Sequence, residues 1–296
     1  MQLVESFLNY LSFEKKYAAN TIISYENDLK EFALFIKIEY EMNTFIEVHY
    51  NIIRAWIVFL VSQNKSNRTI NRKISALKSF YKFLIKTKCI KESPLQKHKS
   101  LKVPKRINIP FNQKEIEEVI LLFDNSTDFN SIRNKLIVET LYATGIRRNE
   151  LISIKLNDVD LKRNTIKVLG KRNKERYIPL LKIIKESIQD YLIVRKEIEN
   201  NCDYLFITEK GNKLYGTLVY RVINSYFSSV SSKVKKSPHV LRHAFATHLL
   251  NEGADLNAVK ELLGHASLAS TQVYINSSLK ELKKVYNKTH PRGLKK

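Results

Sequence analysis

A lysine-rich segment broken by prolines divides this chain into two unequal parts. Between residues 91 and 110, Pro94, Pro104 and Pro110 interrupt every helical period. Proline lacks a backbone donor and clashes with the preceding turn, so neither a helix nor a central strand can run through the segment. Like charges on its lysines repel one another and favour an extended chain. We therefore expect a basic linker at 91–110, between one unit at 1–90 and a larger unit at 111–296.

The shorter part, residues 1–90, shows helical spacing of apolar residues in four stretches. Such spacing predicts helices that bury one face, and Asn20 or Thr21 can cap the second of them. We predict a four-helix unit. The apolar residues that mark its helices are, in order, Phe7 and Leu11; Ile22, Leu29, Phe32 and Ile36; Ile52, Trp56, Phe59 and Leu60; and Ile70, Ile74, Leu77, Tyr81 and Leu84.

Positive charge concentrates in and just after the fourth helix. Residues 65–106 contain 14 basic side chains and a single acidic one, Glu92, whereas residues 1–64 contain 5 basic and 8 acidic. A merely solvated surface mixes both signs, so this segment indicates an interaction surface. At about 100° per residue, four cations share the face opposite the apolar stripe. We predict that they track the phosphates of a DNA duplex: Arg68, Arg72, Lys82 and Lys86.

The charge of the whole chain agrees with a polyanionic partner. It carries 51 Lys+Arg against 29 Asp+Glu, a net charge of +22, which favours nucleic acid first and an anionic membrane surface second. No apolar run approaches the roughly 18 residues of a membrane span, and the first residues lack a signal-peptide pattern. With only two cysteines, a disulfide framework is excluded. We expect a cytoplasmic protein that does not enter a membrane.

The longer part reads as mainly helical with one short β region. Between the helical segments, Lys162-Arg163-Asn164 and the stretch from Gly170 to Lys174 have the composition of turns, so the β region is predicted to be a small antiparallel meander. The fold class is therefore mainly α with a small antiparallel β meander. The predicted elements are helices at 112–123 and 130–143, strands at 159–161, 165–169 and 175–180, and helices at 181–199 and 216–232 and onward to near the end.

A helix start near residue 238 brings two functional side chains together. Ser237 reads as the N-cap and Pro238 as the first helical residue, which places His239 and Arg242 on one face of the first turn. Free amides and the helix dipole favour an anion there, and a phosphate is the natural guest. The alternative is a capped helix whose His and Arg are merely solvated.

The histidines could also be interpreted as metal ligands, but the sequence argues against a metal site. His239 and His243 have metal-ligand spacing, but Val240 stands where the metalloprotease motif has Glu. No Asp, Glu or Cys lies at the usual ligand spacing. The phosphate-binding P-loop and the dinucleotide fingerprint are also absent from the sequence. We expect no metal and no cofactor.

Several short motifs become specific when they are taken together. They are Ala143-Thr144-Gly145-Ile146-Arg147; Gly170-Lys171; His239-Val240-Leu241-Arg242-His243; Leu263-Gly264-His265; and Tyr274. In this order and spacing they resemble the tyrosine recombinase (phage integrase) family, and the resemblance covers essentially the whole chain. The Xer-type branch is suggested by Lys171-Arg172-Asn173-Lys174-Glu175-Arg176 and Thr289-His290-Pro291-Arg292-Gly293. One departure is Arg148-Asn149, between Arg147 and Glu150, where the family often has small residues.

The resemblance implies a role for each matched residue. Tyr274 would attack the scissile phosphate and form a 3′-phosphotyrosine. Arg147 and Arg242 would bind the non-bridging oxygens, and Lys171 would protonate the leaving 5′-oxygen. His239 resembles the acid/base residue near the nucleophile. His265 resembles a second group that stabilises the phosphoryl centre, and Glu150 is a candidate to orient Arg147.

The resemblance also implies partners and an assembly. Residues 1–90 would be a core-binding domain and 111–296 an α+β catalytic domain. The end of the chain would dock on a neighbouring protomer in a homo- or hetero-tetramer on paired DNA sites, through Leu279, Leu282 and Tyr286. Three further cations are expected to contact backbone phosphates: Arg172, Lys174 and Arg176.

Three alternative functions remain open at this point. A mobile-element integrase or transposase would use the same chemistry, and so would a relaxing topoisomerase. An architectural DNA-binding protein would use the scaffold without catalysis. The sequence does not give the target site or say whether the protein acts with a related recombinase.

Overall fold

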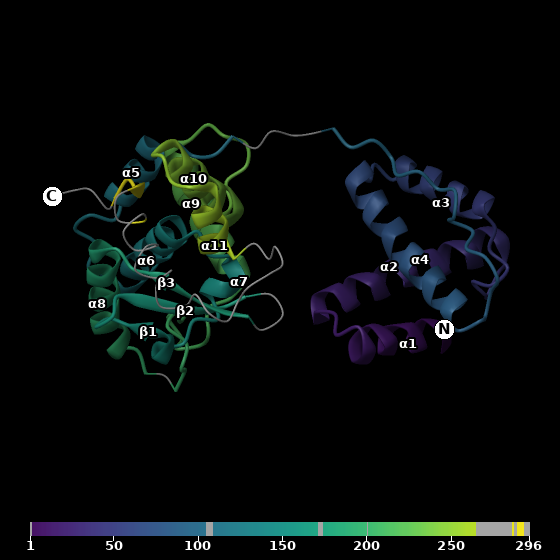
Figure 1. Cartoon of the computed structure of the whole chain (residues 1–296), viewed down its shortest axis with the longest axis horizontal. Coiled ribbons are helices and arrows are strands. Elements are labelled where there is room, and N and C mark those ends of the chain that lie inside the picture. Colours follow the sequence, from purple (N-terminus) through teal and green to yellow (C-terminus); the bar gives the residue numbers. More distant parts are fainter. Residues whose placement is uncertain are drawn as a thin grey trace. The chain divides into compact units, whose positions relative to one another are not determined.

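The computed structural model describes residues 2–104, 109–170, 174–199, 201–264, 286 and 289–292, and it separates into two compact units, residues 1–106 and 107–296 (Figure 1). Four of the predicted site residues lie outside the described residues: Lys171, Arg172, His265 and Tyr274.

The first unit is the predicted helical bundle. Helix α4 contacts the other three main helices and forms the centre of the bundle (Figure 1). A short π-helix, η1, continues α1. The elements are α1 (Gln2–Asn9), η1 (Tyr10–Glu14), α2 (Ala19–Tyr40), α3 (Tyr50–Ser62) and α4 (Asn67–Lys86).

The central helix α4 forms as the sequence pattern predicts. Its apolar stripe is buried, from Ile70, which is 0% exposed, to Leu84. Ser66 caps its start, because the Ser66 hydroxyl accepts a hydrogen bond of 3.2 Å from the backbone N–H of Thr69. The predicted cap of α2 was wrong. Ala18 is the N-cap there and makes no side-chain cap bond, so Asn20 and Thr21 lie inside the helix.

Much of the predicted linker belongs to the first unit. The Leu95 side chain is 2% exposed and packs in the core of the bundle. Leu101 exchanges two hydrogen bonds with the side chain of Asn71 on α4, of 2.8 and 2.9 Å. Lys78 of the same helix donates to the carbonyl of His98. The side chains of Asn71 and Lys78 on α4 thus bind backbone groups of a segment that forms no helix of its own.

The second unit is built around α6. Nine consecutive residues of this helix, 136–144, are buried, because α5, α7, α8, α9 and α10 all contact it (Figure 1). Its helices are α5 (Gln113–Leu121), α6 (Phe129–Thr144), α7 (Arg148–Leu151), α8 (Lys182–Lys196), α9 (Gly216–Val230), α10 (Pro238–Asn251) and α11 (Leu256–Leu263), and a 3-10 turn η2 (Leu156–Asp158) precedes the sheet.

The predicted meander is confirmed as an antiparallel sheet in the order β1-β2-β3. Its strands are β1 (Val159–Asp160), β2 (Thr165–Leu169) and β3 (Glu175–Pro179). Ile166 pairs with Ile178, and both side chains are 1% exposed. The register therefore buries one face of the sheet, and Lys171 falls in the sequence between the end of β2 and the start of β3.

Candidate active site

A glycine corner brings α10 against the end of α6. Gly145 has φ of 60°, the left-handed conformation that glycine adopts without strain. A Cβ atom at this position would lie 2.3 Å from Cδ1 of Phe245 on α10, so no side chain fits. The corner ends α6 and sets Arg147 at the N-cap of α7.

Arg242 reaches this corner from the first turns of α10. Its Nη1 donates to the carbonyl of Gly145 at 2.5 Å, and its Nη2 donates to the carbonyl of Leu263 at 2.7 Å. Burial lowers the pKa of Arg242 to about 10, and the positive charge of Arg147 adds to the effect. The guanidinium is still protonated at neutral pH.

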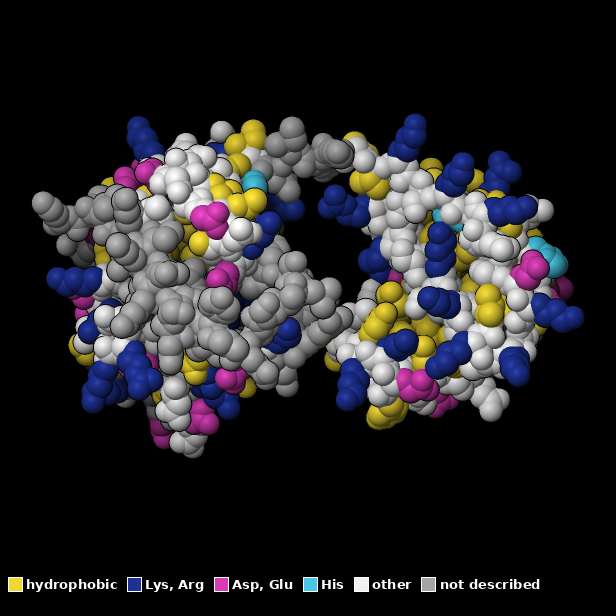
Figure 2. Space-filling model, in the orientation of Figure 1, with side chains coloured by type: hydrophobic (Ala, Val, Ile, Leu, Met, Phe, Trp, Pro, Cys, Tyr) yellow, Lys and Arg dark blue, Asp and Glu magenta, His cyan; other side chains and the backbone are white. Residues whose placement is uncertain are grey.

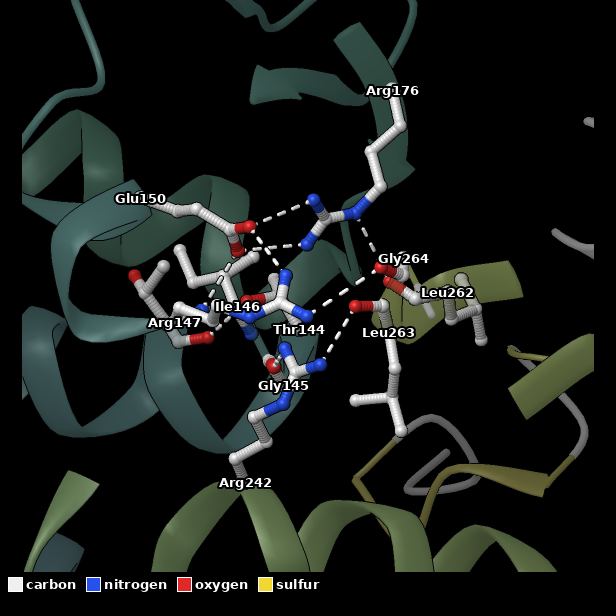
Figure 3. Close-up of polar contacts among 11 residues, drawn as sticks. Thr144, Gly145, Ile146, Arg147, Glu150, Arg176, Arg242, Leu262, Leu263 and Gly264 are labelled. Carbon is white, nitrogen blue, oxygen red and sulfur yellow. Dashed lines mark hydrogen bonds and ion pairs between the residues drawn. The ribbon is translucent and has the colours of Figure 1, made fainter. Parts of the chain in front are cut away.

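Glu150 joins the arginines of the site (Figure 3). It accepts from the backbone N–H of Arg147 at 2.8 Å and from Arg147 Nη1 at 2.8 Å. Arg176 on β3 binds the same carboxylate with two hydrogen bonds, of 3.0 and 2.8 Å. Burial alone would raise the pKa of Glu150, but the bonds from Arg176 and Arg147 lower it below its ordinary value. Glu150 is thus a charged carboxylate that fixes Arg147, as the sequence suggested.

Three consecutive carbonyls at the end of α11 receive the three arginines (Figure 3). Arg176 Nε donates to Leu262 at 3.2 Å, Arg242 Nη2 to Leu263, and Arg147 Nη2 to Gly264 at 3.5 Å. The last carbonyls of a helix lack partners within it and carry partial negative charge, so cations stabilise them. His265 is the next residue in the sequence. The structure brings Arg147 and Arg242 together, as predicted.

His239 lies in the first turn of α10, as predicted, but the capping is different. Ser237 is the N-cap residue, yet its side chain makes no cap hydrogen bond. Partial burial lowers the pKa of His239, and the charges of Arg148 and Arg242 lower it further. The imidazole is therefore neutral at neutral pH and able to accept a proton.

The arrangement is suited to a phosphate. The guanidinium groups of Arg147 and Arg176 share the carboxylate of Glu150, and that of Arg242 lies beside them on the carbonyls of Gly145 and Leu263, so three cations gather around one carboxylate (Figure 3). Backbone carbonyls and this carboxylate hold the cations in place before any ligand arrives. Preorganised cations of this kind stabilise charge that develops on phosphoryl oxygens. Within the described residues, no group of three or more His, Cys, Asp or Glu is placed to hold a metal ion.

The predicted DNA-contacting cations of α4 differ in their surroundings. Arg68 and Lys82 are exposed. Lys86 pairs with Glu14 at 3.1 Å and lies over the ring of Tyr10. On the face drawn in Figure 2, Lys and Arg side chains outnumber acidic ones across the first unit.

Arg72, the remaining cation of that stripe, forms a salt bridge inside the first unit. Its guanidinium binds both oxygens of Asp28, whose side chain is 2% exposed. Lys73, which the sequence pattern did not single out, is buried and bonds to Asp28 at 3.0 Å and to Glu31 at 2.6 Å. Removing Arg72 would therefore disturb a buried charge pair as well as any phosphate contact.

Sequence reasoning missed two features of the site. It gave no role to Arg148, which packs against Gly216 and lowers the pKa of His239. It also grouped Arg176 with Lys174 as phosphate contacts. Lys174 is exposed, but the Arg176 side chain is only 16% exposed and faces Glu150. Strand alternation was the available signal. Residues 176 and 178 share a face of β3, and Ile178 is a core residue.

The described end of the chain packs within its own unit. The predicted docking residues Leu279 and Leu282 lie outside the described residues. Tyr286, the third of them, is 0% exposed and donates its hydroxyl to the carbonyl of Ala143 on α6. His290 is also 0% exposed, and Arg292 binds the buried Glu139 at 3.0 Å. In this single chain Tyr286 therefore packs within its own unit, and docking of the chain end on a neighbouring protomer stays a prediction.

Comparison with known proteins places both units. Residues 110–281 match the Phage integrase family, and residues 4–88 match the family described as Phage integrase, N-terminal SAM-like domain. Tyrosine recombinase XerC of Bacillus subtilis is 40% identical, over 99% of this chain and 97% of its own length. Tyrosine recombinase XerC of Listeria monocytogenes is 38% identical, over 99% and 98%.

Solved structures share the fold. A crystal structure of XerA recombinase has a TM-score of 0.50 at 26% identity, over 96% of this chain and 98% of its own. The XerH site-specific recombinase in a post-cleavage complex with its palindromic difH substrate has a TM-score of 0.69 at 21% identity, over 99% and 93%. No helix in the described ranges is long and apolar enough to cross a membrane.

Proposed function

The chain belongs to the phage integrase family of tyrosine recombinases, and on that premise we propose that it cleaves and rejoins duplex DNA through a 3′-phosphotyrosyl intermediate. It is a site-specific DNA recombinase of the tyrosine type. The observation that carries the chemistry is the cluster in which Glu150 and the end of α11 hold Arg147 and Arg242 side by side (Figure 3).

The proposed reaction conserves the energy of the bond that it breaks. The phenol oxygen of Tyr274 attacks the scissile phosphorus, and the bond from phosphorus to the 5′-oxygen breaks. His239 receives the phenol proton, and Lys171 gives a proton to the 5′-oxygen. The 5′-hydroxyl of another strand then attacks the phosphotyrosine and restores a phosphodiester, so no nucleotide cofactor is consumed.

Cations of this chain take the role that a metal has in many phosphoryl transfers. Charge on the non-bridging oxygens rises in the pentavalent transition state, and the planar forks of Arg147 and Arg242 are matched to it. His265 is proposed to add a further donor. The phenol of a free tyrosine has a pKa of about 10, so positive charge at the site would favour the reactive, deprotonated form of Tyr274.

The proposed biological role is Xer-like resolution of chromosome or plasmid dimers in the cytoplasm, with four protomers on two sites. The similarity to XerC sequences over the full length supports this role. Integration of a mobile element by the same chemistry is the alternative. The positive surface of the first unit would hold the duplex, whereas the arginine cluster would act on one phosphate.

A covalent trapping assay tests the function. A nicked duplex carrying the site found by footprinting on DNA of the host should yield a protein–DNA adduct that survives denaturation and a chelator. With two intact sites, strands should join between duplexes. If supercoils are lost and no strands are exchanged, the protein is a topoisomerase. A bound duplex that never yields an adduct would instead support an architectural role.

The exposed cations of α4 give a prediction about DNA affinity. Replacing Arg68 and Lys82 with Ala should weaken binding to all duplexes and flatten the plot of log affinity against log salt by about 0.9 unit for each phosphate that is no longer neutralised. Arg72 is left intact because its loss would remove two of the hydrogen bonds to the buried Asp28. Measurement by fluorescence anisotropy at several salt concentrations checks this.

The control for that measurement replaces two exposed cations of the second unit, Arg163 and Lys182, with Ala. The total charge changes equally, so a flatter slope confined to the α4 variant locates the DNA-binding surface. An equal slope in the α4 variant and the parent would place that face of α4 in solvent.

A further inference from the structure

The guanidinium of Arg176 packs closely against the backbone at two glycines. A Cβ atom on Gly264 would lie 3.0 Å from Nη1 of Arg176 and 3.1 Å from its Cζ. A Cβ atom on Gly170 would lie 3.4 Å from the same Nη1. The residues that follow these glycines are Lys171 and His265, both proposed to act in the reaction. Arg176 therefore packs between the backbone segments that lead into two reacting groups.

Every nitrogen of this guanidinium has an acceptor inside the unit. Nη1 and Nη2 donate to the two oxygens of Glu150, and Nε donates to the carbonyl of Leu262. A paired, two-bond contact between guanidinium and carboxylate fixes both planes, which a lysine cannot do. Three of its five N–H donors are thus used inside the unit, and the side chain is only 16% exposed, which leaves little of it open to a DNA phosphate.

The carboxylate that Arg176 orients is the one that holds Arg147. Oε1 of Glu150 accepts from both Arg176 Nη1 and Arg147 Nη1. Oε2 accepts from Arg176 Nη2 and from the backbone N–H of Arg147. Without Arg176, Glu150 would lose two of its four hydrogen bonds, and the angle at which Arg147 presents its remaining donors would no longer be fixed.

We propose that Arg176 is a positioning residue for strand cleavage, which acts through Glu150 on Arg147 and through Leu262 on the entry to His265, and that it does not contact DNA phosphates. This inference rests on the proposed function of the site. It changes the expectation from the sequence, in which Arg176 and Lys174 belonged to one phosphate-contacting group.

The test compares Arg176→Met with Arg176→Lys on the nicked duplex, under single-turnover conditions with protein in excess. Arg176→Met should slow adduct formation about 10- to 100-fold, the range typical when a group that orients a reacting residue is removed. The dissociation constant and its salt slope should not change. The rate of adduct formation by Arg176→Lys should be closer to that of Arg176→Met than to that of the parent. Lysine keeps the positive charge but lacks the planar guanidinium that makes two parallel hydrogen bonds.

Two controls separate positioning from charge and from DNA contact. Arg163→Met removes an arginine of the same sheet region whose side chain is 85% exposed, and it should leave the cleavage rate unchanged. Lys174→Met removes an exposed charge two positions from Arg176 and should flatten the salt slope. If Arg176→Met flattens the slope in the same way while its saturated cleavage rate equals that of the parent, Arg176 is a phosphate contact and the proposal is wrong.

A double-mutant cycle tests the route through Glu150. In a Glu150→Gln background, adding Arg176→Met should slow cleavage by less than about threefold, because residues that act through one contact are not additive. Full additivity would overturn the route. Thermal melting of each variant shows whether it is folded. If Arg176→Met does not fold, the same cycle is measured with Arg176→Lys in its place.

Hydrogen exchange gives a readout that does not need catalysis. Arg176→Met should speed exchange of the backbone amides at the end of α11, around Leu263 and Gly264, relative to Arg163→Met. Unchanged exchange together with an unchanged rate would reject the proposal. A parent protein that binds its site and forms no adduct would reject the proposed function instead, and the exchange result would then stand by itself as a structural finding about Arg176.

Discussion

A Tyr274→Phe variant is expected to bind its DNA site like the parent protein and to form no covalent adduct. The phenol oxygen is the proposed nucleophile, and phenylalanine has no atom that can form the phosphodiester bond. The expected effect is complete loss of trapping, the largest effect of any single substitution proposed for this chain. The measurement is the adduct on a nicked duplex, separated under denaturing conditions.

Tyr177→Phe is the matched control. It removes the same hydroxyl from an exposed tyrosine on β3, and it should trap DNA at the parental rate. The chain contains 15 tyrosines, so the trapped peptide should also be identified by mass spectrometry. An adduct in Tyr274→Phe at the parental rate would assign the nucleophile to another residue.

Replacing Arg292 with Met is expected to destabilise the second unit by about 3–5 kcal/mol, the cost of removing one partner of a buried charge pair. Glu139 is 0% exposed on the central helix α6, and Arg292 binds it at 3.0 Å with a side chain that is 11% exposed. Its melting temperature should fall by roughly 6–20 °C if each kcal/mol shifts a domain of this size by about 2–4 °C.

The single tryptophan makes this measurement specific to one unit. Trp56 is buried in the first unit, so its fluorescence follows that unit alone, whereas circular dichroism follows both. Only the circular dichroism transition should move in Arg292→Met. The double variant Arg292→Met with Glu139→Leu should recover part of the loss, because it leaves no unpaired charge, and the exposed Arg163→Met should cost little. A stable Arg292→Met protein would show that the pair contributes nothing.

The packing of the chain end revises one expectation from the sequence. If the end of the chain served only to dock on a neighbouring protomer, as the resemblance implies, a truncation of residues 277–296 would spare the fold of the monomer and abolish assembly. Tyr286, His290 and Arg292 now have partners on α6 and α10 of the same unit, including the rings of Tyr142 and Phe245. Truncation would expose this core, so assembly is better tested by single substitutions.

The elements themselves were largely predictable from the sequence. Spacing of Ile70, Ile74 and Leu77 indicated α4, and the turn-forming residues around β2 indicated the sheet. These signals are local, since a helix or a strand needs only residues near it in sequence to define its buried face. Caps were less predictable. Ser66 and Asp255 cap as their type suggests, whereas α2 starts at Ala19 without a side-chain cap.

The motif residues of the site were predictable, but their partners were not. Arg147 and Arg242 were identified by type and order, and Arg147 finds Glu150 within one helical turn. Arg176 finds the same Glu150 across 26 residues, and Arg292 finds Glu139 across 153. No periodic pattern links residues at such separations, and a charged side chain has the same sequence signature whether it meets solvent, DNA or a carboxylate.

The sequence by itself determined the family, the mainly helical fold with its small sheet, and the residues that are proposed to react. These follow from the types of residue, their order and the spacing of apolar residues, all of which can be read without knowledge of the fold. Only the tertiary structure decided which cations are held within the protein. Burial makes an unpaired charge costly, and the carboxylates of Asp28, Glu139 and Glu150 are buried, so each is paired with a cation that folding brings within reach: Arg72, Arg292 and Arg176. The excess charge of this chain therefore serves both the internal structure and, in the function proposed, the grip on DNA.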